Sequence, residues 1–111
     1  NKIGKHPIIS DGSFYLEPNV FFDAREGPIF IGDGAYIQAF SRIEGPSYIG
    51  SNSVLITGSN IRRSYIGKHC TIGGEVTNSI IADYTSSRHQ SYIGDSYIGE
   101  WVNIRDSLWR D

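Results

Sequence analysis

The most polar stretch of the 111-residue chain covers residues 83–90 and contains His89 beside Arg88. Polar loops on a rigid scaffold often carry binding and catalytic residues. An imidazole titrates near neutral pH, so a histidine in such a loop can accept a proton and pass it on. His89 is therefore a candidate for acid–base chemistry. An ordinary solvent-exposed loop histidine is the alternative.

The other titratable residues fit simpler roles. His6 lies in an irregular leader and His69 in a Gly-Lys-His corner, so both are expected at the surface. Glu75 and Asp83 match no acid–base spacing and are expected to face solvent or neighbouring arginines. No cluster of histidine, cysteine and aspartate has the spacing of metal ligands, so no metal site is predicted.

A six-residue repeat organises the part of the sequence that must position this stretch. Aliphatic residues recur in strict step at Ile31, Ile37, Ile43, Ile49, Leu55 and Ile61. A small residue stands two positions before most of them, as in Ser47-Tyr48-Ile49. In a helix a step of six turns the side chain by about 240°, whereas residues i and i+2 of a strand share one face. The period predicts an all-β, single-domain parallel β-helix.

Three such units make one triangular coil of about 18 residues, so residues 18 apart should stack. Ile31 is then expected under Ile49, and Ile37 under Leu55. About five coils form a prism across residues 14–104, after an irregular leader at 1–13 and before a cap or tail at 105–111. A polar loop near 83–90 replaces one aliphatic position.

The net charge, the lengths of the apolar runs and the cysteine count limit the possible functions and the location of the protein. The net charge is −2, which gives no electrostatic case for binding nucleic acid or an anionic membrane. No apolar run approaches the roughly 20 residues of a membrane span, and no signal-peptide pattern is present. Cys70 is the single cysteine, which excludes an internal disulfide framework and favours a reducing, cytoplasmic location. It occupies a small inward position and is expected to be a packed core thiol.

The repeats resemble those of a known fold. The motif SYIG occurs four times, at Ser47, Ser64, Ser91 and Ser96. The small–x–Ile-Gly units over residues 16–104 resemble the left-handed β-helix of hexapeptide-repeat acyltransferases. Three longer stretches, DAREGPIFIGDGAYIQAFSRIEGP, GGEV and RHQSYIGDSYIGEWVN, narrow the resemblance. They look like the carboxy-terminal domain of sugar-phosphate nucleotidyltransferases, above all the bifunctional glucosamine-1-phosphate acetyltransferase and N-acetylglucosamine-1-phosphate uridyltransferase.

This resemblance implies an acetyltransferase-type domain of a sugar-nucleotide biosynthesis enzyme. The family has a histidine, a tyrosine three residues later and an asparagine eleven further on, which match His89, Tyr92 and Asn103. His89 would then be the general base that deprotonates the sugar amine as it attacks acetyl-CoA. Tyr92 and Asn103 would hold the amino sugar or its phosphate.

The chain also departs from the family pattern. Thr77 stands where the family has a phosphate-binding lysine, and Arg62, Arg63 or Arg88 is expected to substitute. The family continues past the asparagine with a Gly-Ala-Gly-Thr run and further coils that bind acetyl-CoA, whereas this chain continues Ile104-Arg105. These departures suggest a truncated domain.

The outward-facing tyrosines predict that the protein associates with further copies of itself. Tyr48, Tyr65, Tyr92 and Tyr97 share the outward position of their units, and large aromatics on a flat face are enriched where subunits meet. Members of the resembling family are trimers, which implies a homotrimer here. The alternative function is therefore a non-catalytic homotrimerisation scaffold of a sugar-1-phosphate nucleotidyltransferase.

Overall fold

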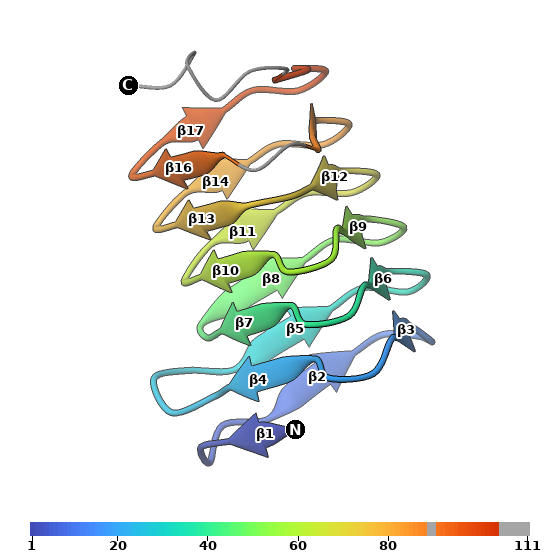
Figure 1. Ribbon diagram of the computed structural model, residues 1–111, viewed down its shortest axis with the longest axis vertical. Helices are drawn as coiled ribbons and strands as arrows, with labels where there is room; N and C mark the ends of the chain where they lie inside the picture. Colours follow the sequence, from blue (N-terminus) through green and yellow to red (C-terminus); the bar gives the residue numbers. More distant parts are fainter. Residues whose placement is uncertain (89–90, 105–111) are drawn as a thin grey trace.

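The computed structural model describes residues 1–88 and 91–104 as a three-sided solenoid of two- and three-residue strands (Figure 1). Successive strands fall in turn on three sheets, named A, B and C here. Sheet A contains β1 (Lys2–Ile3), β4 (Phe21–Asp23), β7 (Arg42–Glu44), β10 (Asn60–Arg62), β13 (Glu75–Thr77) and β16 (Tyr92–Gly94). Sheet B contains β2 (Ile8–Ser10), β5 (Ile29–Ile31), β8 (Ser47–Ile49), β11 (Tyr65–Ile66), β14 (Ile80–Ile81) and β17 (Tyr97–Ile98). Sheet C contains β3 (Tyr15–Leu16), β6 (Tyr36–Ile37), β9 (Val54–Leu55), β12 (Thr71–Ile72) and β15 (Ser86–Ser87).

The architecture confirms the predicted all-β, left-handed parallel β-helix of about five coils. Its register is also as predicted: Ile31 pairs with Ile49, and Ile37 with Leu55. All four side chains are fully buried. Burial of one such side chain stabilises the fold by about 1.5–3 kcal/mol, so these inward columns form the core.

Serine fills the small inward position of sheet B for a reason that the repeat alone does not show. The backbone N–H of Ser64 donates to Ser47 Oγ at 3.1 Å, and that of Ser79 donates to Ser64 Oγ at 3.0 Å. The same bond joins Ser96 to Ser79 Oγ at 3.1 Å. Each hydroxyl thus satisfies a backbone donor of the next coil and ties the coils together.

Cys70 is a packed core thiol, as predicted. Its side chain is 1% exposed, and its Sγ donates to the Ala82 carbonyl at 3.2 Å. Ser53, in the same position one coil earlier, donates to the Gly67 carbonyl at 2.6 Å. Burial raises the pKa of the Cys70 thiol, which disfavours the reactive thiolate. The cysteine therefore takes the place of a serine.

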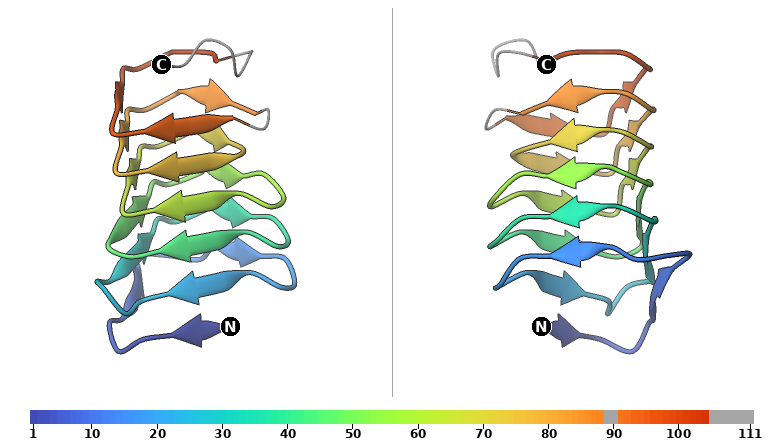
Figure 2. Two further views of the ribbon diagram at one scale, coloured as in Figure 1. Left: turned by 60° about the vertical axis from the view of Figure 1, so that its left-hand side comes forward. Right: turned by 90° about the vertical axis from the view of Figure 1, so that its right-hand side faces the viewer.

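The amino-terminal residues differ from the expected irregular leader. Strand β1 pairs with β4 and strand β2 with β5, so most of a further coil lies below the regular ones (Figure 2). Ile8 packs against the core, and the pairing satisfies the backbone edge of β5. A coil with one open end needs fewer inward residues, which is why the repeat pattern is weak there.

The polar stretch also differs from the expected loop over its described part, residues 83–88. Ser86 and Ser87 form β15, in register with Thr71 and Ile72 of β12. Ser87 is buried in the inward position that an aliphatic residue fills elsewhere, and its hydroxyl lies 3.3 Å from that of Ser91. The coil therefore continues through this stretch. The predicted cap or tail at 105–111 lies outside the described residues.

From β5 onward, the corner between sheets B and C contains one residue with a left-handed backbone in each coil. Its residues include His69, Tyr84 and Trp101, with φ of 55°, 63° and 65°. Their rings stack in parallel, with centroids 5.1 Å apart for His69 and Tyr84 and 4.3 Å for Tyr84 and Trp101. His69 is exposed at this corner, as predicted. No helix within residues 1–88 and 91–104 is long and apolar enough to cross a membrane.

Candidate substrate-binding site

Two of the predicted substrate-binding residues, Arg62 and Tyr92, lie on the outer face of sheet A. Arg62 ends β10 and Tyr92 begins β16, and β13 lies between them. In one outward column Arg62 pairs with Thr77, which pairs with Gly94. In the neighbouring column Glu75 pairs with Tyr92. The site is thus assembled from three successive coils.

Arg62 is held between two carboxylates. Its Nε lies 3.4 Å from Glu44 Oε1, and its Nη1 lies 3.7 Å from Glu75 Oε2. The expectation that Glu75 faces a neighbouring arginine is therefore confirmed. Within the described part of the chain, Arg62 Nε and Thr77 Oγ1 are buried atoms without a hydrogen-bond partner. Both atoms are thus shielded from solvent and lack a hydrogen bond, which is uncommon for buried polar groups.

Tyr92 does not point straight away from its strand. A Cβ built on Gly94 would lie 2.5 Å from Tyr92 Oη, so the phenol occupies the space above Gly94. Because Gly94 heads the column of Thr77 and Arg62, the hydroxyl reaches that column rather than the column of Glu75. Arg62, Thr77 and the Tyr92 hydroxyl consequently follow one another along the outer face.

The other predicted residues are not all on this face. Arg88 is exposed at the corner that follows β15 and leads towards β16. Asn103 is exposed and forms an isolated bridge with Ser86, which places it beside sheet C. The structure therefore does not bring Asn103 onto the face that carries Arg62 and Tyr92. The predicted catalytic residue, His89, lies outside the described residues.

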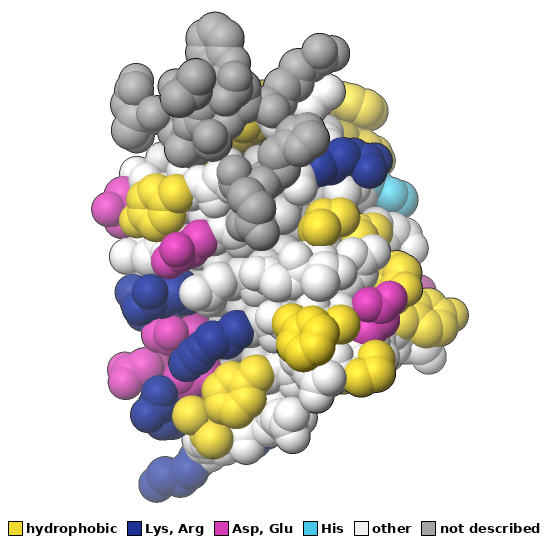
Figure 3. All heavy atoms as spheres, in the orientation of Figure 1, with side chains coloured by type: hydrophobic (Ala, Val, Ile, Leu, Met, Phe, Trp, Pro, Cys, Tyr) yellow, Lys and Arg dark blue, Asp and Glu magenta, His cyan; other side chains and the backbone are white. Residues whose placement is uncertain are grey.

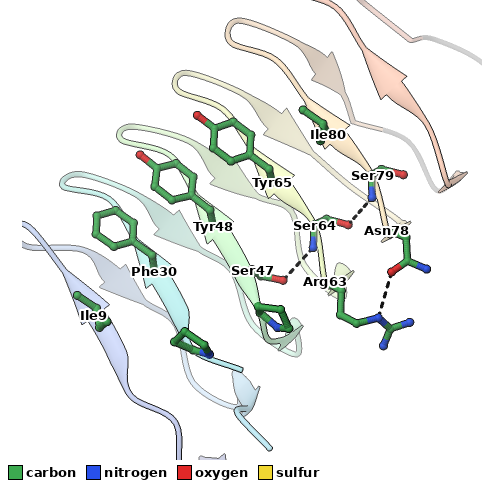
Figure 4. Close-up of a pocket in the computed structure, with 12 residues that line it drawn as sticks. Ile9, Phe30, Ser47, Tyr48, Arg63, Ser64, Tyr65, Asn78, Ser79 and Ile80 are labelled. Carbon is green, nitrogen blue, oxygen red and sulfur yellow. Dashed lines mark hydrogen bonds between the residues drawn. The ribbon is translucent and has the colours of Figure 1, made fainter. Parts of the chain in front are cut away.

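Arg63 belongs to a different surface. Its Nη1 lies 2.6 Å from Glu44 Oε2, and its Nε donates to Asn78 Oδ1 at 3.0 Å. Its side chain lines a groove on sheet B rather than the face of Arg62 (Figure 4). Of the candidates to replace the family lysine at Thr77, Arg62 alone is the cross-strand neighbour of that position.

The groove on sheet B has a volume of about 600 Å³ and is mainly apolar. Phe30, Tyr48 and Tyr65 stack along it with ring centroids 4.8 and 4.6 Å apart (Figure 4). Burial raises the pKa of Tyr65. Proline side chains, Pro28 and Pro46, line the groove as well. This face offers packing surface rather than charge.

A second charged cluster stabilises the amino-terminal part of sheet A. The buried carboxylate of Asp23 accepts hydrogen bonds from Arg25 Nε at 3.0 Å and from Arg42 Nη2 at 2.7 Å. The Arg25 guanidinium, with Arg42, holds the pKa of Asp23 well below its usual range. Acidic and basic side chains alternate along the side that carries β4, β7 and β10 (Figure 3). Among the described residues, no three metal-ligating side chains lie close enough to hold a metal ion.

No protein-family model matches the chain. It is 47% identical to the bifunctional protein GlmU of Thermodesulfovibrio yellowstonii over 105 residues, which cover 93% of this chain and 21% of the relative. The chain is a hexapeptide-repeat left-handed β-helix related to the GlmU proteins. It is 37% identical to the GlmU of Bartonella quintana over 95 residues, 80% of this chain and 20% of that protein. The GlmU of Clostridioides difficile is 40% identical over 77 residues, 67% of this chain and 16% of that protein. The chain thus spans about a fifth or less of the length of these curated relatives.

Sequence reasoning missed two members of the candidate site. Thr77 was noted only as the absence of a lysine, whereas it lies between Arg62 and Gly94 in register. Gly94 was not considered, although Tyr92 and Gly94 are two residues apart in one strand and must share a face. That spacing was the available signal, but the direction of the tyrosine ring required the structure.

Proposed function

We propose that this domain binds an amino-sugar phosphate and is the acetyltransferase-type β-helix of a sugar-nucleotide biosynthesis enzyme. The observation that carries the proposal is the column of Arg62, Thr77 and the Tyr92 hydroxyl on the outer face of sheet A. Similarity to the bifunctional GlmU proteins supports it.

Each residue has a chemical role in the proposal. Arg62 is a planar guanidinium that binds a phosphate with two parallel hydrogen bonds, after exchanging its carboxylate partners. The Tyr92 hydroxyl holds a sugar hydroxyl, and Arg88 adds positive charge at the corner. Asn103 lies beside sheet C and is given no contact with the acceptor. His89 accepts the proton of the sugar amine, because only the neutral amine is a nucleophile.

Acetyl-CoA is the acetyl donor that the family resemblance implies, but the described residues do not fit it. Three arginines, Arg25, Arg42 and Arg63, are engaged with carboxylates, and Arg62 is assigned to the phosphate of the acceptor. The remaining described cations are far apart along the solenoid: Lys2 and Lys5 lie at the first coil, Lys68 between β11 and β12, and Arg88 after β15. They do not gather for the phosphates of CoA. The described residues are therefore assigned to the acceptor alone.

Acetylation of glucosamine-1-phosphate by the protein tests the proposal. His89→Ala is expected to lower the rate by about 100-fold or more, in line with the usual contribution of a general base. His69→Ala is the matched control, because His69 is an exposed histidine on the corner between sheets B and C. A wild-type protein that neither binds the acceptor nor acetylates it would contradict the proposed function.

A second candidate function is a homotrimerisation scaffold, favoured by the stacked rings of Phe30, Tyr48 and Tyr65 on sheet B. Three copies around a threefold axis require a heterologous interface that closes. Analytical ultracentrifugation should then give a trimer whether or not the acceptor is present, and a monomer would contradict this candidate. A cytoplasmic location, which suits the free Cys70 thiol, belongs to both candidates.

A further inference from the structure

The position of the Tyr92 ring depends on Gly94, which has no side chain with which to contact a ligand. The three atoms nearest to a Cβ built on Gly94 all belong to the phenol of Tyr92: Oη at 2.5 Å, Cε2 at 2.7 Å and Cζ at 2.8 Å. A methyl group and the ring therefore cannot occupy this space together. With glycine at position 94, the ring lies along the strand.

This arrangement moves the hydroxyl from one outward column to the other. The Cα of Tyr92 is level with Glu75, whereas the Cα of Gly94 is level with Thr77. Thr77 Oγ1 is buried without a hydrogen-bond partner among the described residues, and Arg62 follows in the same column. The Tyr92 hydroxyl thus lies over the column of Thr77 and Arg62 and not over the column of Glu75.

We propose that Gly94 is a positioning residue for the acceptor site: it leaves room for the Tyr92 ring, whose hydroxyl then lies over the column that contains Arg62. Gly94 acts only through Tyr92, by leaving room for the ring. This inference rests on the proposed function for the identity of the acceptor, but not for the geometry of the ring.

The backbone conformation at Gly94 allows substitution by alanine without strain. Neither Gly94 nor Gly99 has a φ in the left-handed region, so alanine strains the chain at neither position. The three atoms nearest to a Cβ on Gly94 belong to the far end of the half-exposed Tyr92 side chain and not to the backbone, so alanine acts first on the position of that ring. A Cβ on Gly99 meets no atom within 4 Å among the described residues. Gly94→Ala is therefore the test and Gly99→Ala the matched control.

A double-mutant cycle separates positioning from a general structural effect. The affinity for glucosamine-1-phosphate is measured by calorimetry for Gly94→Ala, Tyr92→Ala and the double variant. Gly94→Ala is expected to weaken binding about tenfold in the wild-type background and less than about twofold in the Tyr92→Ala background. Gly99→Ala is expected to leave the affinity unchanged in both.

A second readout needs no ligand. The ring resonances of Tyr92, assigned by comparison with Tyr92→Phe, should shift in Gly94→Ala and stay unchanged in Gly99→Ala. Unchanged ring resonances in Gly94→Ala would overturn the inference, as would an equal loss of affinity in the wild-type and Tyr92→Ala backgrounds. A third outcome is that the ring moves in Gly94→Ala but wild-type protein does not bind the acceptor. The proposed function and the role of Gly94 in ligand binding would then both be wrong. The effect of Gly94 on the position of the Tyr92 ring would still hold.

Discussion

Sheets A and B each bury a column of aliphatic side chains, but their outer faces differ in chemistry. On sheet A, Arg62 lies between Glu44 and Glu75, and polar groups surround it. On sheet B, the rings of Tyr48 and Tyr65 stack 4.6 Å apart beside an apolar groove. Inward residues are constrained by packing, whereas outward residues are free to vary without loss of the coil. The proposed function assigns binding of the charged acceptor to sheet A and association between copies to sheet B.

The largest effect should separate inward from outward positions of one strand. Ile49 is fully buried and Tyr48 is its outward neighbour on β8. Ile49→Asp buries an unpaired carboxylate and is expected to abolish cooperative unfolding, which circular dichroism would detect. Tyr48→Asp should remain folded, with a lower melting temperature. A folded Ile49→Asp protein would contradict the register of the whole solenoid.

The next effect should separate the two outer faces. Arg62→Ala is expected to weaken binding of glucosamine-1-phosphate by about 10- to 100-fold, because a charge-assisted hydrogen bond contributes about 1.5–3 kcal/mol. Tyr65→Ala should leave that affinity unchanged and should lower the trimer fraction in sedimentation. Reversed outcomes for the two variants would exchange the roles of sheets A and B.

The smallest effect concerns the pH dependence of the Asp23 cluster on sheet A. The pKa of Asp23 is lowered in the folded state, so the carboxylate stabilises the fold above its unfolded pKa of about 3.9. This stabilisation is lost as pH falls through the lower folded pKa. Asp23→Asn should therefore lower the melting temperature at pH 7, and its difference from wild type should vanish in strong acid. The exposed Asp95→Asn is the control, and an equal, pH-independent loss in both variants would contradict the assignment.

The inward half of the structure could be predicted from the sequence because its signal is strong and periodic. Ile31, Ile37 and Leu55 recur at six-residue steps, and one period fixes both the strand and its neighbour in the next coil. The same reasoning correctly placed Cys70 in the core. It failed at Ser87, where a buried hydroxyl with a polar partner replaces the aliphatic signal.

The candidate site was less predictable because it depends on register between coils of unequal length. The corner at Gly73 and Gly74 is two residues shorter than its counterpart at 56–59, and the step from Asn60 to Tyr65 is one residue shorter than that from Arg42 to Tyr48. Arg62 therefore stands opposite Thr77 only 15 residues later in the chain. Counting in steps of 18 misses this pairing. The inclination of Tyr92 over Gly94 is a side-chain conformation and leaves no periodic trace.

The account depends most on the claim that the outer face of sheet A binds the acceptor. Backbone NMR shifts of the protein titrated with glucosamine-1-phosphate test it most directly. The account predicts saturable shifts at Arg62, Thr77 and Gly94, with little change at Tyr48 and Tyr65. Shifts confined to the groove on sheet B, or none at millimolar acceptor, would contradict it.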